Sequence, residues 1–336
     1  MRILLVGHYP PHKGGVARHV KQLKECLEKR HEVYVLTYGT VAVEEENVYS
    51  VKVPNIFGIR GTSFALLASK KIVKLHEKYN FDLVHAHYVG TTSFAGVLAK
   101  RKTGVPLVIT AHGSDLEFMS RLPLGGYFVK TSIMEADYVI AVSHYLAKKA
   151  LELGASRISV IPNWTELSGE SERKYILFLG RVASYKGIED FIELAKRFPG
   201  EEFVVAGEGP LLKKLRAKSP PNVKFLGYVP AEDVLKKAKV LVLPSKREGF
   251  GLVVIEANSF KVPVLGRNVG GIRELIRFSK NGYLFEDIED AITYLKTLLV
   301  PKTNVKLGSI GKRISKGHSQ EKMCERVEEI YREVIS

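Results

Sequence analysis

The stretch VLVLPSKREGFGLVVIE, residues 240–256, joins an apolar strand to a helix through a turn that contains two glycines. Gly249 and Gly251 allow the chain to turn sharply. We therefore expect Glu248 at the carboxyl end of the strand and Glu256 about two turns along the helix. Ligands of open α/β sheets bind at that edge. The two carboxylates predict a site for a ligand with several hydroxyl groups, although two acidic residues on a solvated helix would give the same local pattern.

Short apolar runs alternate with helical patterns along the whole chain, which predicts parallel sheets covered by helices. A polar, turn-rich segment at residues 162–172 separates a first series of runs from a second. We therefore expect an α/β fold of two doubly wound, Rossmann-like domains, residues 1–165 and 166–318, facing a central cleft. A terminal helix within residues 319–336 should pack back toward the first domain. The predicted strands are RILLVG, HEVYVLT, FDLVHAH, PLVITAH and DYVIAVS in the first domain, and KYILFLG, EFVVAG, NVKFLG, KVLVLP and VPVLG in the second.

The composition, with 45% apolar and 26% charged residues, is typical of a globular protein. Cys26 and Cys324 suggest neither a disulfide framework nor a zinc-type spacing. With no apolar run like a signal peptide or a membrane span, we expect a reduced, cytoplasmic protein. The net charge of +15 is spread evenly, +7 on residues 1–166 and +8 on the remainder. Polyphosphate-like substrates, an anionic membrane surface and nucleic acid are candidate partners, and motifs typical of nucleic-acid binding are lacking.

Four further glycine-bearing turns, the last at Gly270 and Gly271, follow predicted strands and open helices. Gly14 and Gly15 place bare amides at a helix start, where a phosphate is stabilised, but their spacing is not that of the dinucleotide fingerprint. The loop GRVASYKG carries Arg181 and Lys186, two cations suited to a departing diphosphate, and the turn GEGP repeats the design one strand later. Each turn alone is explained equally well by chain reversal. Together with the paired glutamates, they favour a ligand that contains phosphate.

Histidines gather at predicted strand ends in the first domain. His112 ends a strand, where an imidazole either reaches a ligand or serves as a structural side chain. His85 and His87 point to one face of another strand, and with His112 they would suggest a metal site. No cysteine or carboxylate stands nearby at a recognisable ligand spacing, so we expect no metal site.

In order and spacing, several motifs resemble the retaining GT-B glycosyltransferases of the "glycosyl transferases group 1" family over almost the whole chain. These motifs are GGVARHVKQL, TAHGSD, VIPNW, GRVASYKG, GEGP, PSKREGFGLVVIEA and VGGIRELI. The resemblance implies the GT-B fold, with an acceptor-binding first domain and a second domain that binds a nucleotide-sugar donor. The implied site residues are Arg181 and Lys186 for the diphosphate, Gly14 and Gly15 for its phosphates, Glu256 for the ribose, Glu248 and His112 for the transferred sugar, the amides of Phe250 and Gly251 beside that sugar, and Glu208 and Gly209 in the nucleotide pocket.

The reaction implied by the resemblance is transfer of a hexosyl unit, with retention, from a UDP- or GDP-linked sugar to a hydroxyl acceptor. The family picture needs no divalent metal and the chain has no Asp-x-Asp motif, so neither a metal nor a cofactor is expected. A basic, leucine-bearing helix at residues 63–79 and an apolar loop at 116–130 favour a lipid or lipid-linked glycan acceptor and a peripheral position on the inner face of the membrane, although an ordinary surface helix has the same pattern. Alternatives are a nucleotide-sugar epimerase on the same architecture, a non-catalytic nucleotide-sugar binder and a basic nucleic-acid-binding protein.

Overall fold

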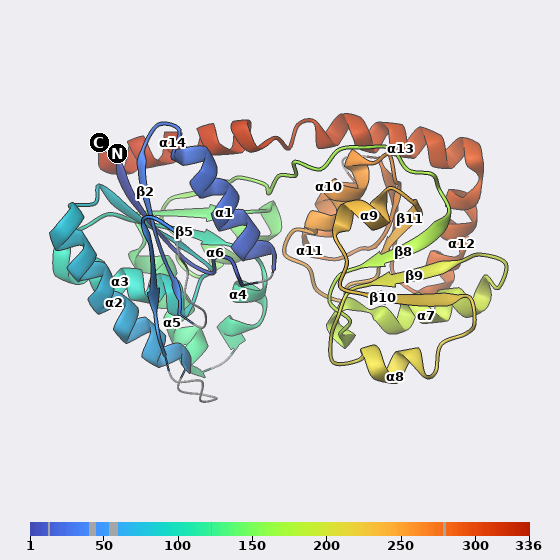
Figure 1. The fold of residues 1–336 in the computed structure, drawn as a ribbon, viewed down its shortest axis with the longest axis horizontal. Coiled ribbons are helices and arrows are strands. Elements are labelled where there is room, and N and C mark those ends of the chain that lie inside the picture. The colour runs from blue at the N-terminus through green and yellow to red at the C-terminus, as the bar shows by residue number, and fades with distance from the viewer. Residues whose placement is uncertain (13, 40–44, 54–59, 122, 278–279) are drawn as a thin grey trace. The chain divides into compact units, whose positions relative to one another are not determined.

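The computed structural model describes residues 1–12, 14–39, 45–53, 60–121, 123–277 and 280–336. The chain divides into two compact units, each described by itself below (Figure 1). Unit 1 is Met1–Asn163 together with Gln320–Ser336, and unit 2 is Trp164–Ser319. The carboxyl-terminal residues are thus part of the first unit.

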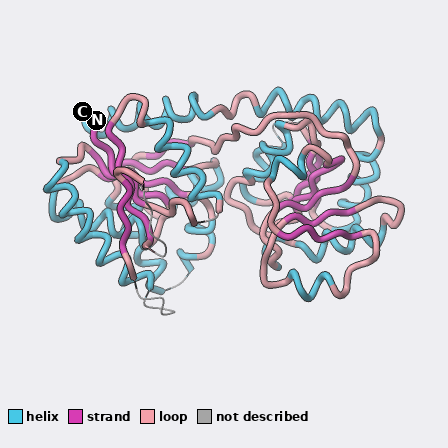
Figure 2. The backbone as a smooth tube through the Cα atoms, in the orientation of Figure 1, coloured by secondary structure: helices cyan, strands magenta, loops and turns pink. Residues whose placement is uncertain are grey.

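Unit 1 is built on a seven-stranded parallel sheet in the order β3-β2-β1-β4-β5-β6-β7. Its inner strands are buried on both faces, as expected when helices cover a parallel sheet on both sides. Figure 2 shows the strands gathered between helices. The strands are β1 (Arg2–Val6), β2 (Glu32–Tyr38), β3 (Val48–Val51), β4 (Leu83–His87), β5 (Leu107–Ala111), β6 (Tyr138–Ala141) and β7 (Ile158–Val160).

The helices of unit 1 form two groups. Helix α2 packs on α3 and α3 on α5, whereas α1 packs on the terminal helix α14. Helix α1 begins after Gly14 and buries Val20, Leu23 and Leu27, a spacing of three and four residues that places them on one face. The helices are α1 (Gly15–Leu27), α2 (Arg60–Tyr79), α3 (Thr91–Thr103), α4 (Ser114–Glu117), the 3₁₀ turn η1 (Met119–Arg121), α5 (Pro123–Glu135), α6 (His144–Glu152) and α14 (Gln320–Ile335).

Unit 2 has a six-stranded parallel sheet in the order β10-β9-β8-β11-β12-β13. Helices α7 and α12 share a hydrophobic core with one face of this sheet, centred on Phe178, Phe191 and Leu295. Helix α10 packs against α9, α11 and α13. The strands are β8 (Tyr175–Leu179), β9 (Phe203–Ala206), β10 (Val223–Gly227), β11 (Ala238–Leu243), β12 (Val264–Arg267) and β13 (Gly282–Phe285). The helices are η2 (Ser184–Lys186), α7 (Ile188–Arg197), α8 (Leu212–Arg216), α9 (Ala231–Leu235), α10 (Leu252–Ser259), α11 (Gly270–Arg277), α12 (Ile288–Leu299) and α13 (Pro301–Ser315).

The α/β fold of two doubly wound sheets is confirmed, and each strand predicted from the sequence is present. The prediction of a loop at residues 116–130 is wrong, because that segment contains the end of α4, η1 and most of α5. Leu122, within it, lies outside the described residues. No helix in the described ranges is long and apolar enough to cross a membrane.

The expectation that the two cysteines stay unpaired is also wrong. Cys26 of α1 and Cys324 of α14 form a disulfide across 298 residues of sequence, and both are buried. The two helices pack side by side within unit 1, which brings together residues whose sequence positions carry no sign of pairing. The bond fastens the end of the chain to the first helix.

Candidate active site

In unit 2, the strand order reverses between β8 and β11. The chain runs from β8 outward to β9 and β10, and then returns to β11 on the other side of β8. The loops that leave the carboxyl ends of two such strands diverge, and the space between them is where open α/β sheets bind ligands. The loop after β8 carries Arg181 and Lys186, and the loop after β11 carries Glu248. The topology therefore brings two of the glycine-bearing turns to one place.

Lys186 and Glu248 form an ion pair at this reversal point. The ammonium Nζ lies 2.5 Å from the Oε2 carboxylate oxygen, which also accepts a hydrogen bond from the Ser245 hydroxyl at 3.3 Å. Burial by itself would lower the pKa of Lys186, but the neighbouring carboxylate outweighs it and the pKa lies above its usual value. The lysine is therefore a charged donor, held in place by a carboxylate that a ligand can also approach.

Glycines fix this loop by allowing backbone contacts that a side chain would block. Gly187 has a positive φ of 66° and lies so close to β11 that an added Cβ would stand 2.0 Å from the Pro244 carbonyl oxygen. An added Cβ at Gly209 would stand 2.3 Å from the carbonyl oxygen of Val182. The turn after β9 is therefore packed directly on the loop that carries Arg181 and Lys186.

The remaining predicted residues of unit 2 differ in exposure. Glu256 is buried on α10, and Phe250 is buried just before that helix, with its ring 6.3 Å from that of His318. Gly251 adopts a positive φ of 92° as the residue that precedes α10, and its Cβ position lies 3.7 Å from the Glu248 side chain. The side chains of Arg181 and Glu208 are exposed.

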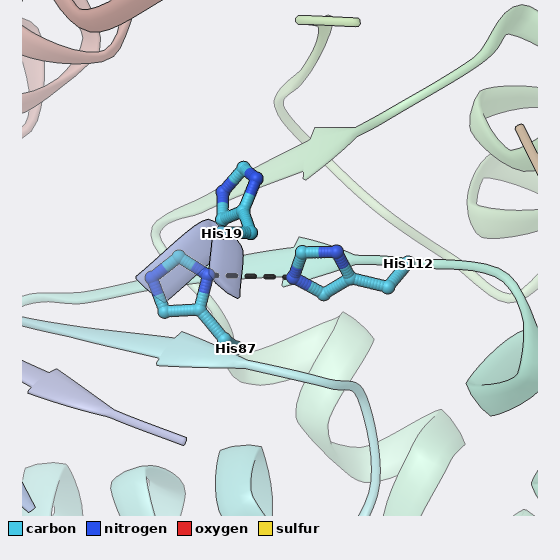
Figure 3. Close-up of side chains that lie close together, drawn as sticks. All are labelled: His19, His87 and His112. Atoms are coloured by element: carbon cyan, nitrogen blue, oxygen red, sulfur yellow. Dashed lines mark hydrogen bonds between the residues drawn. The ribbon is translucent and has the colours of Figure 1, made fainter. Parts of the chain in front are cut away.

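In unit 1, the strand order reverses between β1 and β4, and a cluster of histidines stands at this second reversal point. His87 ends β4, His112 directly follows β5, and His19 lies in the second turn of α1. Nδ1 of His87 and Nε2 of His112 are 3.4 Å apart, and Figure 3 shows His19 standing over the line that joins them. The rings of His19 and His112 meet edge to face, with centroids 4.8 Å apart.

Burial keeps these histidines neutral. Desolvation, followed by the proximity of other imidazoles, lowers the pKa of His112 to about 3 and holds the pKa of His19 and of His87 well below the ordinary value. The cluster is therefore uncharged at neutral pH. Unit 2 offers a charged pair at the equivalent position.

The loop of His112 is held by Asp115, a residue to which the sequence patterns assigned no role. Its buried carboxylate accepts hydrogen bonds from the backbone N–H groups of His112 (2.9 Å), Gly113 (2.7 Å), Leu116 (3.0 Å) and Val89 (3.0 Å). Burial raises the pKa of Asp115, and the four N–H groups oppose that rise. The position of Asp115 at the end of the motif TAHGSD, just after a predicted strand, is the sequence feature that could have indicated its role. His19 was missed as well, although it lies within the quoted GGVARHVKQL.

Gly14 and Gly15 open α1 as predicted. Gly14 has a φ of 132°, which a side chain rarely tolerates, and an added Cβ on either glycine would meet no atom within 4 Å. The amino end of α1 therefore leaves space for a ligand to approach its backbone.

Comparison with known proteins places the chain in a class. The model of Glycosyltransferase Family 4 matches residues 13–168, and that of Glycosyl transferases group 1 matches residues 162–313. An uncharacterized glycosyltransferase of Methanocaldococcus jannaschii is 31% identical, with 99% of each chain covered. N-acetyl-alpha-D-glucosaminyl L-malate synthase of Bacillus anthracis is 26% identical over 78% of each chain.

Solved structures agree on the architecture. Sucrose-phosphate synthase of Thermosynechococcus elongatus superposes with a TM-score of 0.87 at 20% identity, over 99% of this chain and 98% of the other. The Anabaena protein HepE, in complex with UDP and glucose, superposes with a TM-score of 0.80 at 20% identity, over 98% of each chain. Two Rossmann-like parallel sheets of this kind define the GT-B fold, which confirms the fold inferred from the resemblance. The chain belongs to the glycosyl transferases group 1 family and is a glycosyltransferase.

Proposed function

We propose that this protein transfers a hexosyl unit, with retention at the anomeric carbon, from a UDP- or GDP-linked sugar to a hydroxyl group of a glycan or lipid-linked acceptor. The observation that carries the proposal is the Lys186–Glu248 ion pair at the reversal point between β8 and β11. The Lys186 ammonium can bind a phosphate, and the Glu248 carboxylate, 2.5 Å away, can accept hydrogen bonds from hydroxyl groups. A phosphorylated sugar carries both kinds of group. HepE, which shares the fold, was crystallised with UDP-glucose.

In this proposal, unit 2 binds the donor. Lys186 and Arg181 bind the diphosphate and stabilise the negative charge that grows on it as the glycosidic bond loosens. Glu256 binds the ribose hydroxyls, and Glu248 binds the hexose. The backbone amides of Phe250 and Gly251 lie beside the hexose, while Glu208 and Gly209 line the nucleotide pocket.

Residues 1–165 would bind the acceptor. Gly14 and Gly15 would approach the phosphates through the amino end of α1, which leaves space for them. His112 would contact the hydroxyls of the transferred sugar.

The transfer step follows from these charges. The bond between the anomeric carbon and the diphosphate oxygen breaks, and its electron pair leaves on the diphosphate. The acceptor oxygen then bonds to the same face of the carbon, and its proton passes to the departing phosphate. Because Lys186 and Arg181 neutralise the leaving group, the step as proposed does not require a divalent metal.

The acceptor proposal rests on an exposed strip of α2. Leu66 is 52% and Leu67 is 41% exposed, and Lys70 and Lys74 follow them on the solvent side of the helix. Leucines beside lysines suit an anionic lipid surface. Among the relatives are a UDP-Gal:alpha-D-GlcNAc-diphosphoundecaprenol alpha-1,3-galactosyltransferase of Escherichia coli, 27% identical, and a phosphatidylinositol N-acetylglucosaminyltransferase subunit of Schizosaccharomyces pombe, 25% identical. We expect the protein, working in the cytoplasm, to dock on the inner face of the membrane.

Vesicle flotation tests the membrane proposal. The protein should float with anionic vesicles at low salt, and Leu66→Ser should weaken that binding. Leu226→Ser, which removes a leucine of similar exposure (47%) from unit 2, serves as the control. Equal flotation of the two variants would exclude α2 as the docking strip.

Donor binding tests the main proposal. A thermal-shift screen without added metal should give a clear rise in melting temperature with one series of UDP-, GDP- or ADP-sugars, because a ligand at a hundred times its Kd stabilises by about 2.7 kcal/mol. NMR of the product formed from that donor should then show the donor's own anomeric configuration. Inversion would refute retention, and conversion of the donor sugar without an acceptor would favour an epimerase. If no donor binds, and duplex DNA binds with an affinity that falls steeply as the salt concentration rises, the nucleic-acid-binding alternative is favoured.

A further inference from the structure

The histidine cluster of unit 1 has the spacing of a metal site. Two imidazole nitrogens on one tetrahedral zinc ion lie about 3.3 Å apart, since each Zn–N bond is about 2.0–2.1 Å. Nδ1 of His87 and Nε2 of His112 are 3.4 Å apart. The ligand atoms of these two residues and His19 all lie within 4.8 Å of one another, so the three side chains form a candidate ligand set (Figure 3). The His19 ring also forms a hydrogen bond with the Asn163 side chain, which a metal ion would have to leave in place or displace.

The contact between His87 and His112 joins two ring nitrogens, Nδ1 of the first and Nε2 of the second. Two facing imidazole nitrogens need a proton between them, because two lone pairs repel each other. A metal ion can take the place of that proton.

His85, which the sequence pairs with His87, does not belong to the set. Its Nδ1 lies 2.6 Å from the Tyr331 hydroxyl and its Nε2 lies 2.7 Å from the Thr110 hydroxyl, so both of its nitrogens are occupied. The metal set considered from the sequence is therefore corrected, with His19 of α1 in the place of His85.

We propose that His19, His87 and His112 bind one divalent transition-metal ion, for which zinc is the best match. Imidazole ligands suit zinc, copper and nickel and do not suit magnesium or calcium. Three histidines leave the fourth tetrahedral position open to water or another small ligand.

A bound metal would have a consequence for transfer that rests on the proposed function. It would occupy the Nε2 atom of His112 and withdraw that side chain from the donor sugar. The site would therefore hold the transfer reaction back, in agreement with a reaction that uses no metal. The binding test below needs no substrate, so it succeeds or fails independently of the transferase proposal.

Cobalt(II) provides the test, because a tetrahedral nitrogen site gives it a strong visible absorption that the hydrated ion lacks. The chelator-treated full chain should develop this absorption and saturate at one Co²⁺ per chain, and one equivalent of Zn²⁺ should abolish it. His19→Ala and His87→Ala should each weaken zinc binding by more than the roughly 10–100-fold that loss of an outer-sphere partner costs. His144→Ala, which removes an exposed histidine of α6, should change nothing.

A spectrum like that of hydrated cobalt, or an unchanged signal in both His19→Ala and His87→Ala, would overturn the proposal. Should the buried His87 variant fail to fold, His19→Gln on the half-buried face of α1 keeps the test open. Anomalous diffraction at the zinc edge from wild-type crystals is independent of any variant. A peak between the three rings is expected there, and its absence at saturating zinc would refute the site.

Discussion

The two units place opposite kinds of chemistry at the same point of the same topology. Each sheet reverses its strand order once, between β1 and β4 in unit 1 and between β8 and β11 in unit 2. Unit 2 has a charged Lys186–Glu248 pair there, whereas unit 1 has neutral imidazoles that are buried or half-buried. Nine of the ten histidines lie in unit 1, and His318 is the one in unit 2. A shared fold therefore fixes where a ligand is met, and the loop residues decide what charge it meets.

Acid should give the largest difference between the two units, because the histidines whose pKa is lowered on folding lie in unit 1. The pKa of His8 is lowered to about 4 and that of His85 and His112 to about 3, mainly by desolvation, from an ordinary 6.5. Below pH 6.5 these histidines bind protons in the unfolded chain but not in the folded chain. Their contribution to the free energy of unfolding is therefore fully present above pH 6.5 and is lost as the pH falls toward the folded pKa values. Each such histidine costs on the order of 2 kcal/mol at pH 5.

Hydrogen exchange with a metal chelator present, corrected for its intrinsic pH dependence, measures this difference. Amides of unit 1 should lose protection between pH 6.5 and 5, while those of unit 2 keep it. His144→Ala, a change at an exposed histidine, should leave the profile as it is. Equal losses in the two units would show that the histidines do not govern the acid response.

Breaking the ion pair should disable unit 2 without unfolding it. Lys186→Met removes the cation proposed to stabilise the leaving diphosphate, and loss of one such donor costs about 10²–10³-fold in kcat. Lys246→Met, on the neighbouring loop and exposed, is the matched control for net charge and should stay within a few-fold of wild type. Steady-state kinetics and a melting curve of each variant distinguish the outcomes. Normal turnover in Lys186→Met would remove that lysine from the site.

The sequence predicted the alternation of strands and helices correctly, but it did not predict which histidines form the cluster. Apolar runs and glycine turns are local signals, so the loops that carry Glu248 and Lys186 could be placed at strand ends from the amino-acid sequence alone. His19 meets His87 and His112 only once the fold has formed, and the same holds for the contact of Asp115 with Val89. His85 and His87 share a strand face, yet hydrogen bonds to Tyr331 and Thr110 occupy the first. The spacing of residues in the sequence does not show which hydrogen-bond partners a side chain will have in the fold.

The disulfide was missed for the same reason, and it distinguishes the units further, because both cysteines of the chain lie in unit 1. Reduction should lower the free energy of unfolding of unit 1 by roughly 2–4 kcal/mol, because the cross-link restricts the unfolded chain. Hydrogen exchange of α14 should rise on reduction, with unit 2 unaffected. The double variant Cys26→Ser, Cys324→Ser should exchange like the reduced protein and ignore the reductant. Protection of α14 that survives reduction would mean that the Tyr331–His85 hydrogen bond and the Arg30–Glu328 ion pair already hold the helix.

The smallest expected loss of stability comes from the contacts that fix the site loops. In unit 2, close backbone contacts at glycines fix the loop after β8, whereas in unit 1 the carboxylate of Asp115 fixes the loop after β5. Asp115→Asn keeps the shape but replaces one accepting oxygen with an amide that donates, so part of the four N–H bonds to residues 89, 112, 113 and 116 is lost. We expect a loss of about 1–3 kcal/mol, read from urea unfolding. Asp82→Asn, which affects a more exposed carboxylate that accepts the Arg2 N–H at the opposite end of the sheet, should cost less. If Asp115 positions His112, Asp115→Asn should also weaken cobalt binding. If the carboxylate is purely structural, the variant should lower stability and leave the cobalt spectrum and affinity unchanged.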